Sequence, residues 1–112
     1  MALLTMCMPI LPGKTEKWQG MMDEMLAPSS ESRKAFSASR EAAGVHERTF
    51  LQETPNGNFV ILTFEGDNPE EGFAKIMENM PLDFAEFAKD VHGLDVKAPL
   101  PDLPKLVYDS KA

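Results

Sequence analysis

Cysteine is nearly missing from this chain of 112 residues, which contains only Cys7. An intramolecular disulfide is therefore impossible, and metal sites built from several thiolates are ruled out. Cys7 lies in an apolar stretch with no basic residue near it in the sequence. Because a reactive thiol needs a basic and partly exposed setting, we expect Cys7 to be buried and inert.

Basic residues are also few, with 11 Lys and Arg against 18 Asp and Glu and a net charge of −7. Nucleic-acid binding needs clustered basic residues, so no nucleic-acid partner is expected. No segment reaches the ~20 apolar residues of a membrane span, and the apolar N-terminal stretch has neither the basic segment nor the cleavage site of a signal peptide. We therefore expect no membrane partner and a cytoplasmic location.

Motifs for common cofactors are missing as well. No glycine-rich phosphate loop follows a predicted strand, no serine stands in a GxSxG elbow, and the two histidines, His46 and His92, have no metal-binding spacing. A metal site would need a carboxylate to converge on both histidines, and haem ligation by either one has no supporting motif. We expect no metal and no cofactor.

The residues that are present predict one domain, 1–112, whose size allows a core without disulfides. Residues 2–10 form an uncharged strand that is apolar on both faces, which is typical of a central strand. Thr15 is a candidate N-cap for a helix that contains Trp18 in a buried stripe and ends at Pro28. Ser29 or Ser30 can cap a second helix, which runs to residue 43 and ends at Gly44.

Two strands, 45–54 and 58–65, flank Asn56-Gly57, a dipeptide typical of two-residue hairpin turns. This turn predicts that Thr54 opposes Phe59 and that Arg48 opposes Glu65. One face is then apolar and should lie under the helices: Val45, Thr49, Leu51, Val60, Leu62 and Phe64. The opposite face mixes apolar and polar residues: His46, Arg48, Phe50, Gln52, Phe59, Ile61, Thr63 and Glu65.

Two more helices and a short strand complete the prediction. Asn68 and Pro69 mark the start of a helix that ends at Pro81, and Asp83 should cap a further helix that ends at Gly93. Residues 98–104 contain three prolines and should be extended, and residues 106–108 offer a fourth strand. The order favours an α+β fold, a ferredoxin-like βαββαβ unit with a four-stranded antiparallel sheet and helices on one face. The uncovered face, with Phe50, Phe59 and Ile61, predicts a homodimer through the open sheet face.

Several stretches resemble a known group: residues 9–18, 47–55, 64–69 and 92–95. Across nearly its whole length the chain is similar to the dimeric α+β barrel superfamily within the ferredoxin-like folds, and most of all to small uncharacterised bacterial proteins. That group includes antibiotic-biosynthesis monooxygenases, muconolactone isomerase, EthD-like proteins and haem-degrading enzymes. The resemblance implies a dimeric α+β barrel. It assigns no reaction, because members use dissimilar residues for dissimilar chemistry.

The predicted register places His46, Arg48 and Glu65 together on the open face. A histidine beside a carboxylate can act as a general base, and an arginine can bind an anionic group of a substrate. A cross-strand Arg48–Glu65 ion pair with His46 at its rim explains the same residues without a substrate.

His92 and Asp95 lie at the end of the last predicted helix. In one interpretation, His92 is a base at the mouth of a cleft and Asp95 is the carboxylate that orients it. In the other, His92 has no catalytic role, because a histidine in the last turn of a helix is stabilised by the helix dipole. The candidate catalytic residues are thus His46 and His92. The candidate ligand-binding residues are Arg48, Phe50, Phe59, Glu65, Asp95 and Trp18.

Two functions follow from these candidates. The first is an uncharacterised dimeric protein that binds a small organic ligand between sheet and helices. The alternative is a cofactor-independent monooxygenase or isomerase in which His46 or His92 is the base and Arg48 orients the substrate.

Overall fold

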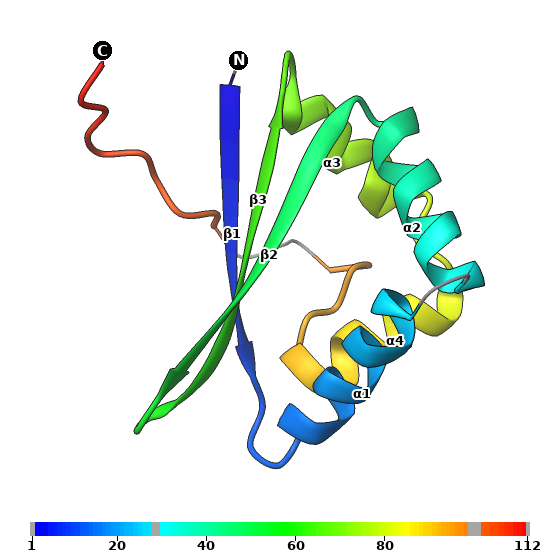
Figure 1. The fold of residues 1–112 in the computed structure, drawn as a ribbon. Coiled ribbons are helices and arrows are strands. Elements are labelled where there is room, and N and C mark those ends of the chain that lie inside the picture. The colour runs from blue at the N-terminus through cyan, green and yellow to red at the C-terminus, as the bar shows by residue number, and fades with distance from the viewer. Residues whose placement is uncertain (1, 28–29, 99–101, 112) are drawn as a thin grey trace.

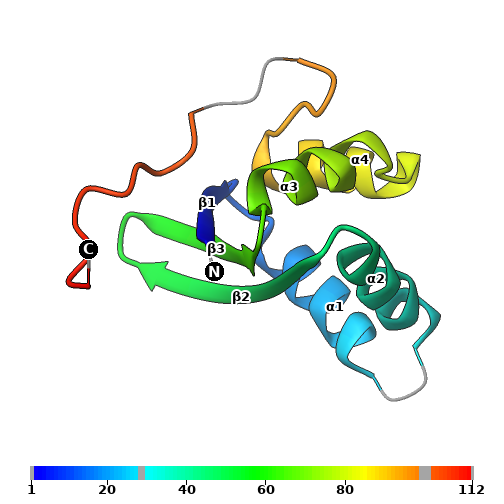
Figure 2. The ribbon, with the colours of Figure 1, turned by 90° about the horizontal axis from the view of Figure 1, so that it is seen from above.

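A three-stranded antiparallel sheet with strand order β1-β3-β2 carries four helices on one face (Figures 1 and 2). The computed structural model describes residues 2–27, 30–98 and 102–111. The elements are β1 (Ala2–Ile10), α1 (Thr15–Leu26), α2 (Glu31–Ala42), β2 (Val45–Thr54), β3 (Gly57–Gly66), α3 (Pro69–Glu78) and α4 (Leu82–His92).

The hairpin forms, but its turn lies one residue earlier than predicted. The pairing of β2 with β3 is therefore shifted by two residues, since Thr54 was expected to oppose Phe59. Thr54 pairs with Gly57, so the loop is Pro55-Asn56 rather than Asn56-Gly57. Pro55 has no N–H to give to a ladder and its φ suits a turn, which explains why the chain reverses there. The Thr54 hydroxyl closes the loop through Asn56 N and Gly57 O.

The slip of two residues leaves the faces unchanged, because side chains alternate with a period of two. Arg48 therefore opposes Thr63, and His46 opposes Glu65. The predicted apolar face does lie under the helices, with Val45, Val60 and Phe64 buried in it.

The prediction of a four-stranded ferredoxin-like βαββαβ sheet is wrong, because the antiparallel sheet has three strands and four helices accompany it. Residues 106–108 form no strand, and Leu106, Val107 and Tyr108 are exposed. Proline cannot donate to a ladder, and Pro104 stands two residues before this short apolar segment. Pro99 and Pro101, also expected to be extended, lie outside the described residues. The stretch 102–111 runs on the side of the sheet away from the helices (Figures 1 and 2).

Without that fourth strand, β1 is an edge strand and not the central strand that its composition indicates. It pairs with β3 alone, and Leu3 is 60% exposed. Cys7 is exposed rather than buried, because it points to the face that carries no helix and lies beside Ile61 in the register.

Helix ends follow the predicted capping in some places only. The Asn68 side chain accepts the N–H of Glu71, and Gly93 ends α4 at φ +68°, both as expected. Ser30 caps α2 by accepting Arg33 N at 3.2 Å; Pro28 and Ser29 lie outside the described residues. Two predicted caps are wrong, because α1 begins after Lys14 and α4 after Pro81, neither with a side-chain cap bond.

Ion pairs on the surface connect α1 with α4. Lys14 and Lys17 place their ammonium groups 2.9 and 2.5 Å from the two carboxylate oxygens of Asp90. Lys17 and then Lys14 hold the pKa of Asp90 below its usual value through these hydrogen bonds. The pairs are solvent-exposed, so they align the two helices more than they stabilise the fold.

A close approach of backbone fixes α3 against the start of β2. A Cβ on Gly72 would lie 2.6 Å from the carbonyl oxygen of Ala43 and 2.7 Å from a methyl carbon of Val45. Because backbone cannot move aside as a flexible side chain can, only glycine fits here.

We predict opposite effects for the same substitution in two helices. Gly72→Ala should lower the free energy of unfolding by about 1–3 kcal/mol through overpacking. Gly20→Ala, in α1 with open space around it, should raise it by about 0.5–1 kcal/mol through helix propensity. Urea denaturation measures both, and a Gly72→Ala protein as stable as the wild type would contradict the close packing.

Candidate functional site

The open sheet face carries five of the sequence-predicted site residues. Arg48 Nη1 lies 3.3 Å from Glu65 Oε1, and His46 is directly opposite Glu65 in the register. Phe50 is 51% exposed, and Phe59 lies on the same face of β3. These residues do lie together, as the sequence predicts.

The charged residues on this open sheet face are exposed to solvent. The side chains of Arg48 and Glu65 are 45% and 32% exposed, so water weakens their attraction. None of the five residues lines the cavity described below.

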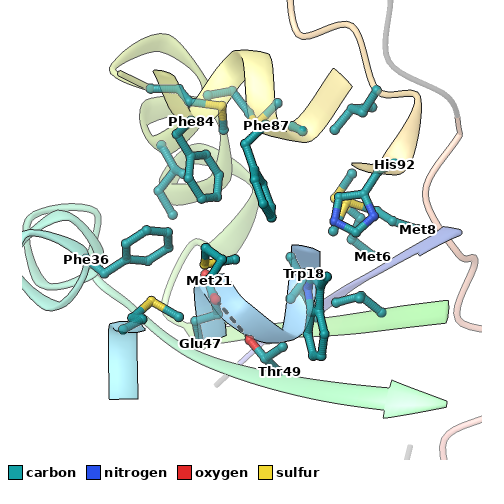
Figure 3. Close-up of a pocket in the computed structure, with 18 of the residues that line it drawn as sticks. Met6, Met8, Trp18, Met21, Phe36, Glu47, Thr49, Phe84, Phe87 and His92 are labelled. Carbon is teal, nitrogen blue, oxygen red and sulfur yellow. Dashed lines mark hydrogen bonds between the residues drawn. The ribbon is translucent and has the colours of Figure 1, made fainter. Parts of the chain in front are cut away.

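A partly open cavity lies on the other face of the sheet, between the strands and the four helices. Its volume is about 70 Å³. Methionine and aromatic side chains form more than half of its wall (Figure 3). They are Met6, Met8, Trp18, Met21, Met22, Met25, Phe36, Phe64, Phe73, Met77, Met80, Phe84 and Phe87.

The spacing of side chains along the strands and helices explains why both contribute to this wall. Strand residues that alternate on the helix side of β1 and β3 form its floor, including Met6, Met8 and Phe64. Residues spaced by three or four on α1 form its cover, including Trp18 and Met22. Methionine side chains are flexible and polarisable, so such a wall can adapt to guests of different shape.

A short chain of polar groups enters the cavity from one side. Glu47 Oε1 accepts a hydrogen bond from Arg40 Nε at 2.8 Å, and its other oxygen accepts one from the Thr49 hydroxyl at 3.2 Å. The side chains of Arg40 and Glu47 are only 16% and 14% exposed. Figure 3 shows Glu47 and Thr49 at the base of the cavity.

Sequence reasoning missed Arg40 and Glu47. The signal was present, because Glu47 lies between Val45 and Thr49 with the same alternation and so had to point to the helix face. An acidic residue on an apolar face needs a partner, and Arg40, at the end of the preceding helix, provides it.

His92 is 8% exposed and lines the cavity, on the side away from Phe36 (Figure 3). Its Nδ1 lies 2.8 Å from the carbonyl oxygen of Pro9. Since a carbonyl can only accept, Nδ1 carries the hydrogen in the neutral ring and Nε2 keeps its lone pair. Burial lowers the pKa of His92, and the bond to Pro9 offsets part of that effect.

Trp18 and His92 are thus the sequence-predicted site residues that the structure places at the cavity. Asp95 is exposed, and its carboxylate accepts the backbone N–H of Lys97 at 2.9 Å. In the described part of the chain no hydrogen bond joins Asp95 to His92; Pro9 takes the orienting position instead.

The two histidines lie on opposite faces of the sheet, so they cannot share a metal ion. Within residues 2–27, 30–98 and 102–111, no group of three His, Cys, Asp or Glu side chains is placed to hold one. In the same ranges, none of the helices has the length and apolar character needed to cross a bilayer.

A scan of protein-family models found no match to this sequence, and a search of curated proteins found none either. The resemblance to the dimeric α+β barrel superfamily therefore stays a prediction.

The buried histidine makes a prediction about pH. Because the pKa of His92 is lower in the folded chain than its ordinary 6.5, the unfolded chain binds the proton more tightly. Stability should be complete above about pH 6.5 and fall as the pH decreases below it. Urea denaturation at pH 7.5 and 5.5 should show this decrease in the wild type.

The matched variants are His92→Asn, which keeps a donor for Pro9, and His46→Asn on the open face. The decrease should shrink in His92→Asn and persist in His46→Asn. An unchanged decrease in His92→Asn would show that another group is responsible.

Proposed function

We propose that this protein binds a small organic molecule in the cavity between its sheet and its helices. The observation that carries the proposal is an apolar space of about 70 Å³ bordered by a few convergent polar groups. Ligand sites in proteins commonly have this composition, with an apolar wall and a small number of placed hydrogen-bonding groups.

The alternative is that the space is a packing defect, which no added ligand would occupy. A single water needs about 10–15 Å³, so the space is larger than one water and offers water few partners. An empty cavity of this volume costs on the order of 1–2 kcal/mol. A bound apolar guest would recover that energy, which supports a ligand.

An enzymatic role is the second candidate, and one observation favours it. His92 presents an unprotonated Nε2 beside an apolar space, which is a suitable arrangement for a general base. Arg48 cannot orient the same substrate, because it lies on the opposite face of the sheet. In a monooxygenase or isomerase of this kind, Arg40 would take that position.

A homodimer through the open sheet face is part of the proposal. Cys7, Ile61 and Phe50 stand in one row across the three strands, and Phe59 follows in the next row of that face. Exposed apolar rows of this kind commonly mark contact surfaces. A cytoplasmic location, expected from the sequence, also stays a prediction.

Filling the cavity tests the binding function. Ala88 is buried and lines the cavity, so Ala88→Leu should occupy the space that a ligand needs. Octan-1-ol is the probe and emission from Trp18, the one tryptophan in the chain, is the signal. Ala88→Leu should weaken binding at least tenfold and change the free energy of unfolding by less than about 1 kcal/mol.

Ala38→Leu, on the exposed side of α2, is the control and should bind as the wild type does. Full binding by Ala88→Leu would contradict the proposed site.

Light scattering tests the dimer. The wild type should have a mass of roughly 25 kDa, twice the 12.4 kDa of one chain. Phe50→Lys should raise the dimer dissociation constant at least tenfold, because it places a charge in the apolar row. Leu82→Lys, at an apolar residue on α4 that is 67% exposed against 51% for Phe50, should not. A monomeric wild type at micromolar concentration would refute the dimer.

A further inference from the structure

A groove on the outer surface borders the cavity. It lies between α2 and the α3–α4 pair and has a volume of about 400 Å³. Five side chains line both the groove and the cavity, so the two spaces share one wall: Phe36, Arg40, Ile76, Met80 and Phe84.

The shared wall contains an aromatic contact that a guest must pass. Phe36 of α2 and Phe84 of α4 meet edge to face, with ring centroids 5.1 Å apart. The Arg40 guanidinium lies 4.4 Å from the centroid of Phe36. Figure 3 shows Phe36 and Phe84 on one side of the cavity, with Trp18 and His92 on the other. Both phenylalanines are half-buried and belong to different helices, so a separation of α2 from α4 would be needed to open the wall.

The groove has a charge of one sign. Its lining includes Arg40 and Lys75 together with the polar Ser39 and Asn79, and no acidic side chain. Glu47 lies on the cavity side of Arg40 and holds its Nε, while Nη1 bonds to the Ser39 hydroxyl at 3.2 Å. In the described residues Nη2 makes no hydrogen bond, which leaves a donor for an anionic acceptor.

Lys75 is also available to such an acceptor. Its ammonium lies 3.5 Å from a carboxylate oxygen of Glu71, in an ion pair whose side chains are 53% and 61% exposed. A pair of this kind is weak, so the lysine can turn into the groove at little cost.

We propose that the ligand is an amphipathic anion, a medium-chain carboxylate. Its carboxylate binds Arg40 and Lys75 in the groove, and its alkyl chain passes between Phe36 and Phe84 into the methionine-lined cavity. This inference rests on the proposed function, since it names the ligand class for the same cavity. The cationic groove selects the head group, and the apolar wall selects the chain.

Three probes of equal chain length separate the contributions of head and tail: octanoate, octan-1-ol and octylamine. Each is titrated into the full-length protein, and Trp18 emission reports occupation of the cavity. Octanoate should bind roughly tenfold more tightly than octan-1-ol, as expected for charge-assisted hydrogen bonds, and octylamine most weakly. The preference for octanoate should decrease at high salt.

Reversing one charge tests the head-group site without touching the cavity. Lys75→Glu should weaken octanoate binding at least tenfold, strengthen octylamine binding and leave octan-1-ol unchanged. Lys34→Glu is the matched control, because Lys34 forms a similar exposed pair with Glu31 on α2 but does not line the groove. It should change none of the three affinities.

Arg40 needs a paired change, since its loss alone leaves Glu47 without its partner. The double variant Arg40→Gln with Glu47→Gln keeps two groups that can hydrogen-bond to each other and removes both charges. It should lose the preference for octanoate over octan-1-ol while still binding octan-1-ol.

The outcomes separate this inference from the proposed function. Equal affinity for octanoate and octan-1-ol, unchanged by Lys75→Glu, would overturn the anionic ligand and leave the binding cavity intact. Tighter binding of octylamine than of octanoate would overturn it as well. If none of the three probes changes Trp18 emission or the melting temperature, both proposals fail.

Discussion

The position of β3 between β1 and β2 is the constraint on which both surfaces of this protein depend. Its backbone is hydrogen-bonded on both sides, so its register sets which side chains of the neighbouring strands face the helices. Val60 and Phe64 anchor the core from this strand, while Ile61 and Glu65 alternate with them on the open face. The cavity and the exposed rows are therefore two consequences of one pairing pattern, and a shift of a single residue would exchange them.

Much of this arrangement could be predicted from the alternation of side chains. The apolar face was assigned correctly even though the turn was placed one residue too late, because an error of two in register preserves the faces. Pro55 carried the information that was overlooked, since a proline suits the turn better than the strand. The start of α3 and the end of α4 were also predictable, because Asn68 and Gly93 are strong local signals for these two positions.

Other features depend on contacts between distant segments, and no local pattern predicts them. Thr15 was expected to cap α1, yet its hydroxyl accepts a hydrogen bond from Asn58 instead. The cavity needs side chains from both sheet and helices, so the methionine stripe of α1 indicated only a buried face. Glu47 was predictable in part. The alternation of the strand shows that its side chain faces the helices, but its pairing with Arg40 could not be predicted without knowing where α2 lies. The expected fourth strand failed because three apolar residues after a proline do not specify a pairing partner.

The close contact at Gly72 has a mechanical consequence for the groove. It holds the first turn of α3 against Ala43, at the end of α2, with no room for the two elements to move closer. Elsewhere in the groove, α2 and α4 meet through the edge-to-face contact of two side chains, Phe36 and Phe84, which can yield more easily than backbone. Helices held together at one end can separate only by pivoting, so the opening would be wedge-shaped. Such a taper favours a guest that is narrow along its length, and it disfavours a broad, rigid one.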